Sequence, residues 1–448
     1  MLDVSAARRE GPRASPGPAR SGGYADAWDE MVAGDGTIRD PWRPLFGVLA
    51  GLGAGELAAR GERLRQQLED DGVTFNLYGG EEERRSGAGR LQSRPWALDA
   101  VPVVIGAAEW RRIDRGVAQR ARLLDRVLAD LHGPRSLLAE RRYPPGLVFG
   151  SPEFMRACQS DPAAPPTLFL QHYAADLARG ADGVWRVVAD RVQAPAGAAF
   201  AAHHRRAMAR TMGEAFAACR VRPISPFFES WAADLRARAP AGATNPLVVV
   251  LTPGPFNEAH AEHASLAREL GATLAQGADL TVRDRRVFLK TLGGLEPVGT
   301  ILRRVDGAWC DPLELRADST LGVPGLVDAA RAGGGGIANP LGAALVEAPA
   351  MAAFLPRLCE RLLGESLALP SIATWWCGQS YALKEVLARL PALTLRSALS
   401  PDGTPVDAQA LDPDARAELV ARLRANPASY VAQERVVPSV APGEGATG

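Results

Sequence analysis

The stretch Leu247-Val248-Val249-Val250-Leu251-Thr252-Pro253-Gly254-Pro255-Phe256-Asn257 decides the fold class of this 448-residue chain. Its first five residues form a continuous apolar run, typical of a strand buried on both faces of a parallel sheet. A tight Pro/Gly loop follows, and helical spacing then runs from Glu258 to Leu270. Strand, loop and helix in this order begin an open α/β sheet, whose ligands bind beyond the carboxyl ends of the strands. The stretch therefore predicts an α/β lobe with Gly254 and Asn257 in a substrate-binding loop.

Periodicity on either side of this stretch predicts further helices and strands. Helices are expected over 56–71, 108–131, 201–219, 227–238, 326–332, 350–363, 381–389 and 413–425. Strands are expected over 73–78, 273–276, 300–304, 393–396 and 430–434, with hairpins over 167–192 and 280–289 and a charged loop over 79–94. The chain therefore mixes α and β elements along its whole length, without an internal repeat.

Composition excludes several function classes. Lys+Arg and Asp+Glu both number 51, so bulk charge indicates neither nucleic acid nor an anionic membrane as partner. Five scattered cysteines and the lack of a long apolar stretch indicate a cytoplasmic protein with reduced thiols. The only lysines are Lys290 and Lys384, so any step that needs a lysine has two candidates.

Single motifs do not define a site. Gly333 to Gly336 lack the Gly-Lys-Ser/Thr that completes a P-loop, which favours a turn. His260 and His263 share a helix face, but spacing implies no third zinc ligand. Cys377 follows two tryptophans and has no partner that would make it a nucleophile.

Ten linked segments are more informative. They are Tyr24 to Met31, Val73 to Phe75, Val148 to Pro152, Val188 to Gly197, Leu251 to Asn257, Ile301 to Asp306, Asp311 to Leu315, Leu321 to Leu326, Thr374 to Gly378 and Tyr430 to Glu434. In order and spacing they resemble the type 2 circularly permuted ATP-grasp family, from about residue 24 to about residue 437. The resemblance implies an α/β fold of α+β lobes, with an open α/β lobe on the substrate side.

The resemblance also implies a reaction class. ATP-grasp enzymes hold ATP between two lobes and phosphorylate a carboxylate, and an amine or thiol then attacks the acyl phosphate. ATP and Mg²⁺ are the implied cofactors, and small carboxylates and amines, or a peptide, are the implied substrates. The resemblance assigns Asp190 to the metal ion. It assigns four residues to ATP binding, which are Arg396, Gln433, Glu434 and Lys290. It assigns four residues to catalysis, which are Arg303, Arg304, Asp306 and Arg205.

The nucleotide side departs from the family pattern at four places. The metal strand reads Ala189-Asp190-Arg191 in place of acid–Asp–Asn, and an Arg beside the metal position repels the ion. His203-His204-Arg205 replaces Glu-Asn-Arg, so only Arg205 matches. Leu395-Arg396-Ser397 replaces the phosphate-facing lysine. The loop 398–403 has lost the glycines that would let backbone N–H groups wrap a phosphate.

These features predict a domain order and leave three interpretations open. We expect a disordered tail over 1–23, an N-terminal segment over 24–110, the metal-strand part over 111–240, the substrate-side lobe over 241–369, the phosphate and hinge lobe over 370–437 and a disordered tail over 438–448. The family fold continues beyond the hinge strand, which predicts a shortened member whose missing segment a partner chain supplies. The chain is a degenerate ligand- or partner-binding ATP-grasp protein, an active carboxylate–amine ligase, or a scaffold without a nucleotide.

Overall fold

The chain divides into two compact units that are interleaved in sequence. The computed structural model describes residues 27–77, 92–158, 169–240, 245–401 and 403–443. The first unit comprises Met1–Trp110, Ala196–Arg304 and Ser439–Gly448, and the second comprises Arg111–Pro195 and Val305–Pro438. The expected tail over 1–23 and most of the loop over 79–94 lie outside the described residues.

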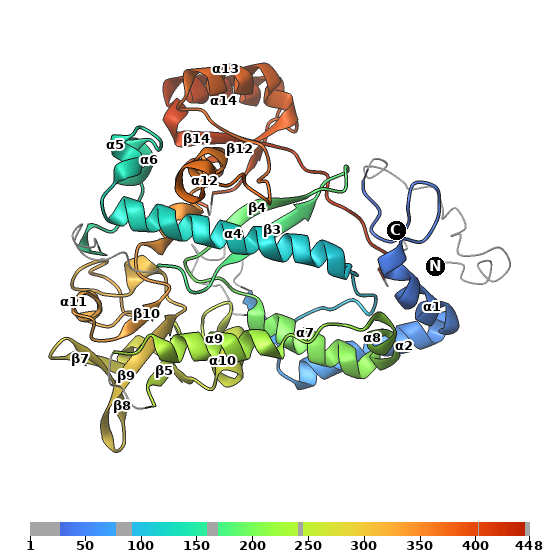
Figure 1. The fold of residues 1–448 in the computed structure, drawn as a ribbon, viewed down its shortest axis with the longest axis horizontal. Coiled ribbons are helices and arrows are strands. Elements are labelled where there is room, and N and C mark those ends of the chain that lie inside the picture. The colour runs from blue at the N-terminus through green and yellow to red at the C-terminus, as the bar shows by residue number, and fades with distance from the viewer. Residues whose placement is uncertain (1–26, 78–91, 159–168, 241–244, 402, 444–448) are drawn as a thin grey trace. The chain divides into compact units, whose positions relative to one another are not determined.

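The first unit contains a mixed sheet built around the apolar run at 247–251. Strand β5 (Leu247–Leu251) pairs in parallel with β6 (Thr273–Ala275) and with β9 (Gly294–Arg303). Strands β8 (Arg286–Thr291) and β7 (Leu280–Arg283) extend the sheet in antiparallel fashion, giving the order β6-β5-β9-β8-β7 (Figure 1). The last four residues of β5 are buried. The predicted parallel sheet is confirmed, and it lies in a different unit from the hairpin predicted over 167–192.

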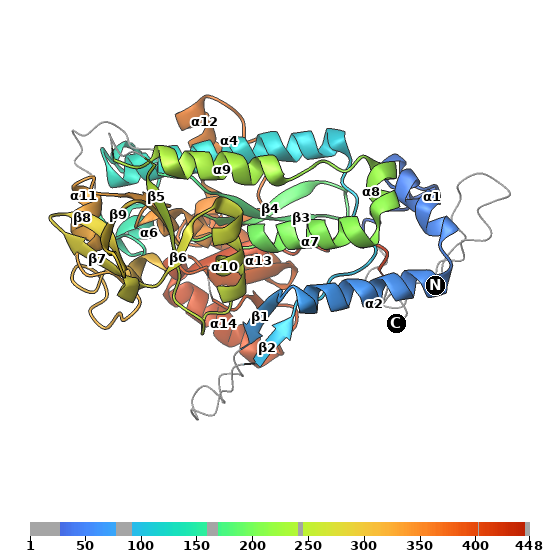
Figure 2. The same ribbon diagram turned by 90° about the horizontal axis from the view of Figure 1, so that it is seen from below.

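Helices of the first unit cover the sheet and form a separate apolar core. They are α1 (Arg43–Gly51), α2 (Ala54–Asp70), α7 (Ala198–Thr211), α8 (Gly213–Cys219), α9 (Ser225–Ala237) and α10 (His260–Leu270). Helices α2 and α7 run side by side (Figure 2), and Trp42, Leu45, Leu64 and Met208 are buried in this core. The single helix predicted over 201–219 is two helices. Met212 leaves the helical backbone between them, and its side chain is fully buried in the core.

Sequence periodicity missed two pairings of the first unit. Strand β1 (Thr74–Leu77) pairs with β2 (Gln92–Pro95), which lies where a loop was expected, because Gln-Ser-Arg-Pro has no apolar alternation. Val440 donates its N–H to the carbonyl oxygen of Trp28 and accepts a hydrogen bond from the N–H of Glu30. The expectation of a disordered tail from residue 438 is thus not met at Val440, and 444–448 lie outside the described residues.

The second unit combines a long helix, a hairpin and a four-stranded sheet. Helix α4 (Ala107–His132), which enters this unit at Arg111, confirms the strongest helical prediction. The hairpin is β3 (Ala174–Arg179) with β4 (Trp185–Arg191), and the sheet has the order β11 (Thr374–Trp376), β14 (Tyr430–Glu434), β12 (Leu393–Ser397), β13 (Val406–Asp407). The other elements are α5 (Ser136–Ala139), α6 (Pro145–Phe149), α11 (Leu326–Arg331), β10 (Gly336–Ala338), α12 (Leu355–Leu363), α13 (Ser380–Arg389) and α14 (Pro413–Ala425).

The core of the second unit joins these elements. Leu124, Leu128 and Leu131 of α4 pack with Leu355 and Leu358 of α12 in one buried cluster. A smaller cluster lies between the four-stranded sheet and helices α13 and α14. The hairpin is tied to the segment before β11, because Val187 pairs with Ser371. Strand β4 and the four-stranded sheet are therefore held in one unit, and the candidate site lies between them.

Candidate functional site

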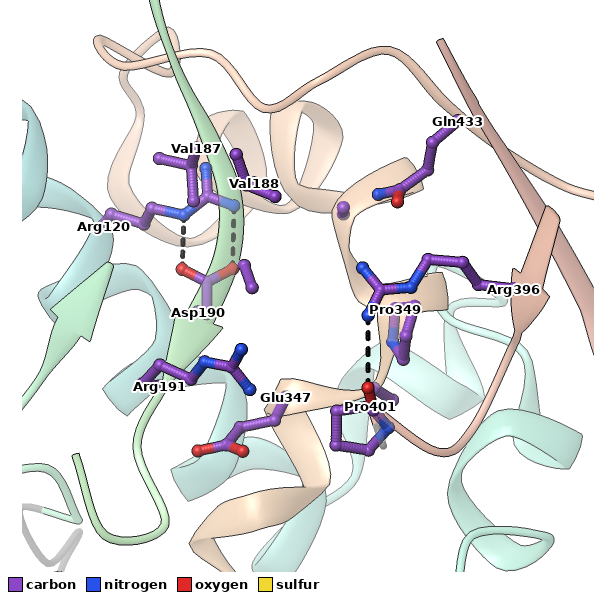
Figure 3. Close-up of a pocket in the computed structure, with 13 residues that line it drawn as sticks. Arg120, Val187, Val188, Asp190, Arg191, Glu347, Pro349, Arg396, Pro401 and Gln433 are labelled. Carbon is purple, nitrogen blue, oxygen red and sulfur yellow. Dashed lines mark hydrogen bonds and ion pairs between the residues drawn. The ribbon is translucent and has the colours of Figure 1, made fainter. Parts of the chain in front are cut away.

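The described residues of the second unit line a cavity of about 400 Å³, a volume that includes space open to solvent. Strand β4 contributes Asp190 and Arg191, β12 contributes Arg396 and β14 contributes Gln433, while Arg120 comes from α4 (Figure 3). Asp190, Arg396 and Gln433 were all predicted as metal or ATP residues from segments far apart in sequence. The fold therefore brings these three predicted residues to one cavity.

Both oxygens of the Asp190 carboxylate accept hydrogen bonds from protein donors. Its Oδ1 accepts hydrogen bonds from Arg120 Nε at 2.6 Å and from the Tyr173 hydroxyl at 2.7 Å. Its Oδ2 accepts one from Arg120 Nη2 at 2.8 Å. Only 1% of the Arg120 side chain and 7% of the Asp190 side chain are exposed. Burial lowers the pKa of Arg120, but Asp190 more than compensates, so the net shift of that pKa is upward.

Two further arginines point into the cavity from opposite sides (Figure 3). Arg191 of β4 forms an ion pair with Asp176 of β3, with Nη2 and Oδ2 2.9 Å apart. Arg396 of β12 donates to the carbonyl oxygen of Pro401 at 3.1 Å, and no carboxylate in the described chain lies within ion-pair distance of it. Burial lowers the pKa of Arg396, and the positive charge of Arg191 lowers it further. Arg396 is thus a partly buried cation whose charge has no anionic partner in the described residues.

The hinge residues differ in their surroundings. The Gln433 side chain is buried, lines the cavity and donates from Nε2 to Thr374 Oγ1 at 3.2 Å. Glu434 is exposed, does not line the cavity and pairs with Arg389 of α13 at 2.9 Å. The alternating directions of side chains along β14 separate the two residues, which the sequence had placed together.

A magnesium ion does not fit the carboxylates at this cavity. Mg²⁺ requires hard oxygen ligands in near-octahedral geometry, and both Asp190 oxygens are taken. Glu347, the other lining carboxylate, accepts hydrogen bonds from the backbone N–H groups of Val192 and Gln193 through Oε1. Among the described residues no group of three His, Cys, Asp or Glu side chains is placed to hold a metal. The assignment of Asp190 as a metal ligand therefore conflicts with its contacts.

The predicted catalytic arginines of the first unit are buried. Arg303 ends β9 and is 1% exposed, and Arg304 is 5% exposed. Burial lowers the pKa of Arg304 to about 10, and the negative charge of Glu262 on α10 opposes that shift. Glu262 accepts a hydrogen bond from the backbone N–H of Gly197, at the start of α7. Arg304 thus belongs to a buried charge cluster with Glu262, and its catalytic role, like that of Arg303, stays a prediction.

The remaining predicted residues are dispersed. In the first unit, Arg205 lies 5.7 Å from the ring centre of Phe216, and Lys290 donates to the carbonyl oxygen of Ala278 at 2.8 Å. In the second unit, exposed Asp306 accepts a hydrogen bond from Gln193 Nε2 at 3.3 Å. Neither Arg205 nor Lys290 is among the residues that line the cavity.

The substrate loop after β5 is held rigidly. The backbone carbonyl of Asn257 accepts a hydrogen bond from Asn76 Nδ2 at 2.9 Å, and its side chain caps the N–H of Ala259 at 3.0 Å. Gly254 has φ +105°, and a Cβ there would lie 2.6 Å from Gln276 Oε1. Only glycine fits that position without strain, which supports a fixed loop conformation.

Sequence reasoning missed Arg120 and Glu347, which line the cavity, and Tyr173, which donates a hydrogen bond to Asp190. Arg120 stands in the strongest helical pattern of the chain, where a charged residue is expected on the solvent face. The sequence contained one signal that Arg120 is buried. At helical spacing Arg120 falls on the same face of α4 as Ile113, Leu124 and Leu128, which are apolar. A buried arginine requires a buried acid, and Asp190 was the acid already singled out.

Comparison with known protein families assigns the chain to the ATP-grasp class. Residues 102–444 match the model of the family described as circularly permuted ATP-grasp type 2. Because this match covers well over half of the chain, the chain belongs to the circularly permuted ATP-grasp type 2 family, and its α/β fold is that of the family. A glutathione synthetase-like effector of Globodera pallida has a similar fold, with a TM-score of 0.56, 12% identity and coverage of 87% of this chain and 83% of the effector.

The curated relatives are uncharacterized proteins. One from Mycobacterium tuberculosis is 38% identical over 92% of this chain, and this chain spans only 46% of that relative's length. A second from the same organism is 36% identical over 94% of this chain and 74% of its own length. One from Synechocystis is 31% identical over 91% of this chain and 83% of its own length. Within the described residues, no helix is long and apolar enough to cross a membrane.

Proposed function

We propose that the cavity of the second unit binds the phosphate groups of ATP, or of a related phosphorylated anion, through Arg191 and Arg396 without a bound magnesium ion. On this proposal the chain is an ATP-grasp protein that holds its ligand with little or no ligase turnover. The observation that carries the proposal is Arg396, a partly buried guanidinium that faces the cavity and has, among the described residues, only a carbonyl oxygen as hydrogen-bond partner.

The electrostatics of the two arginines support an anionic ligand. The pKa of Arg396 is lowered by burial and by Arg191, so the charged form of Arg396 is disfavoured while the cavity contains no anion. A phosphoryl group between two guanidinium groups removes this repulsion and accepts charge-assisted hydrogen bonds from both. Fixed arginines then supply the positive charge that a metal ion supplies in other nucleotide sites.

Calorimetry with ATP in the presence of EDTA tests the proposal. We expect the Arg396→Gln variant to bind ATP at least about tenfold more weakly than the unmodified chain, since one charge-assisted hydrogen bond contributes about 1.5–3 kcal/mol. Arg422→Gln, which removes an exposed arginine of α14 in the same unit, is the matched control and should bind normally. Equal affinity of the Arg396→Gln variant and the unmodified chain would refute the proposal.

An active carboxylate–amine ligase is the second candidate function. It is favoured by the convergence of Asp190, Arg396 and Gln433 on one cavity, as the family pattern implies. Its substrates are small carboxylates and amines, or a peptide. The free cysteines of the described chain agree with a cytoplasmic location for either function. ADP release from ATP, Mg²⁺ and an amino acid mixture distinguishes this candidate from the first.

A further inference from the structure

We infer that Arg120 is the residue that makes this cavity independent of metal ions. Its guanidinium occupies both oxygens of Asp190, the carboxylate that the family pattern assigns to Mg²⁺. This inference rests on the proposed function. It names the residue that determines whether arginines or a metal ion supply the positive charge at the site. Arg120 acts here as a positioning residue that withholds a carboxylate from solution cations.

The hydrogen bonds of Arg120 leave little freedom. Nε and one Nη2 hydrogen are directed to Asp190, and Nη2 also donates to Ser371 Oγ at 2.9 Å. Nη1 donates to the carbonyl oxygen of Leu369 at 3.4 Å. Of five N–H groups on the guanidinium, four have acceptors. A bidentate pair with this many partners is pre-organised, so its dissociation would leave several buried groups unsatisfied.

Helix packing fixes Arg120 in place. On the preceding position of α4, Gln119 donates to Glu365 Oε2 at 2.7 Å and accepts from the backbone N–H of Ala368 at 2.8 Å. One turn earlier, Gly116 lies so close to Leu369 that a Cβ on the glycine would be 2.6 Å from the Leu369 Cβ. The segment that receives α4 continues to Ser371, which pairs with Val187 of β4. Arg120 and the strand of Asp190 are therefore held against the same short segment.

A divalent cation would have to displace this arginine. With Arg120 at 1% exposure, removing it from Asp190 would leave a buried guanidinium without its counter-charge. Such an uncompensated buried charge is far more costly than the contact of Mg²⁺ with a single carboxylate can repay. The cavity is thus selective for an anion bound directly by arginine, and adding Mg²⁺ or Mn²⁺ does not recruit Asp190.

Binding of Mn²⁺, followed by the electron paramagnetic resonance signal of the free ion, tests this inference on the full chain. The unmodified chain should not bind Mn²⁺ through Asp190, so Asp190→Asn should leave its Mn²⁺ titration unchanged. The Arg120→Gln variant frees a carboxylate oxygen and should bind Mn²⁺ at least about tenfold more tightly than the unmodified chain. Adding Asp190→Asn to Arg120→Gln should abolish that gain, and Arg126→Gln, an exposed arginine of α4, is the matched control.

Each outcome decides the inference. Asp190-dependent Mn²⁺ binding by the unmodified chain would overturn it, as would a folded Arg120→Gln variant without gain. If Arg120→Gln does not fold, Arg120→Lys replaces it, because lysine keeps a counter-charge for Asp190 and releases one carboxylate oxygen. The same tenfold gain in Mn²⁺ affinity is then expected of Arg120→Lys, and its absence would overturn the inference. The Mn²⁺ titration contains no nucleotide, so its result does not depend on ATP binding. If the chain bound no ATP, the proposed function would be refuted, but the Mn²⁺ titration would still decide the role of Arg120.

Discussion

Arg120 and Asp190 form an ion pair whose side chains are both almost fully buried. Replacing a buried pair by apolar groups is often neutral, whereas removing one partner leaves an uncompensated charge. The Tyr173 hydroxyl adds a third member to this network, and burial, with the charge of Asp190, raises the pKa of Tyr173. The pair therefore determines the local stability of the cavity wall as well as its charge.

A double-mutant cycle tests this account of the pair. Asp190→Leu and Arg120→Met are each expected to lower the free energy of unfolding by about 3–5 kcal/mol, because each leaves a buried charge unpaired. The combined variant should lose clearly less than the sum of the two single losses. Urea unfolding followed by tryptophan fluorescence measures the free energy of unfolding of the unmodified chain, the two single variants and the combined variant. Strict additivity of the two losses would contradict the account.

His263 makes stability depend on pH. Burial, together with the nearby charges of Arg304 and His260, lowers the pKa of His263 from 6.5 to about 3. Between these two pH values the unfolded chain binds a proton at His263 that the folded chain does not bind. The free energy of unfolding is therefore unaffected by His263 above about pH 6.5 and decreases as the pH falls below that value. By about pH 5 the loss from this residue is about 2 kcal/mol.

The His263→Gln variant isolates this contribution. Its free energy of unfolding should fall by about 2 kcal/mol less than that of the unmodified chain when the pH is lowered from about 7.5 to about 5. Glu262 does not mimic the effect, because burial raises its pKa and gives a pH dependence of opposite sign. Parallel pH profiles of the two proteins would show that His263 is protonated in the folded chain.

Single residues could be predicted only where the family pattern marks them. Asp190, Arg396 and Gln433 were found in this way and share a cavity. Arg120 and Tyr173 were missed because each makes its important contact with a residue far away in sequence, 70 and 17 positions respectively. Sequence spacing gives no information on such contacts, and the buried charge of Arg120 even opposes the helical pattern in which it lies.

At the scale of elements, the two glycines Gly47 and Gly116 show how packing overrides helix propensity. Both lie inside helices, α1 and α4, where glycine is less favourable than alanine. A Cβ at Gly47 would meet nothing within 4 Å, whereas one at Gly116 would lie 2.6 Å from the Cβ of Leu369. The first glycine is therefore replaceable and the second is required for the docking of α4.

Alanine at each position should shift stability in opposite directions. Gly47→Ala should raise the free energy of unfolding by about 0.5–1 kcal/mol through backbone entropy and propensity. Gly116→Ala should lower it by about 1–3 kcal/mol, because α4 must move away from Leu369. Thermal unfolding of the two variants beside the unmodified chain measures both. A stabilised Gly116→Ala variant would show that α4 does not pack this closely.

Elements with strong periodicity were predictable, and those without it were not. The apolar run of β5 and the helical repeat of α4 each carry enough residues for the period to be unambiguous. Strand β2 has no apolar face, and α1 is interrupted by glycine, so neither gave a signal. The break between α7 and α8 at Met212 depends on tertiary packing of that side chain, which periodicity does not contain.

At the scale of the whole molecule, the fold was predictable from ten segments in register, whereas the interleaving was not. The first unit collects three stretches of sequence and the second collects two, so neither corresponds to a continuous block of chain. Contacts between distant segments, such as Val440 with Trp28, hold the first unit together. The chain also spans about half the length of the first curated relatives it matches, so the activity of those longer proteins is not its own by default.

The affinity of the unmodified chain for ATP, measured by calorimetry once with excess Mg²⁺ and once with EDTA, tests the central claim most directly. Binding should be weak and should differ by less than about threefold between the two conditions, because arginines and not a metal ion neutralise the phosphates. The double change Ala189→Glu with Arg191→Asn should make binding depend on Mg²⁺ only when Arg120→Gln also releases Asp190. Tight ATP binding by the unmodified chain that requires Mg²⁺, with ADP release on adding an amino acid mixture, would contradict the account.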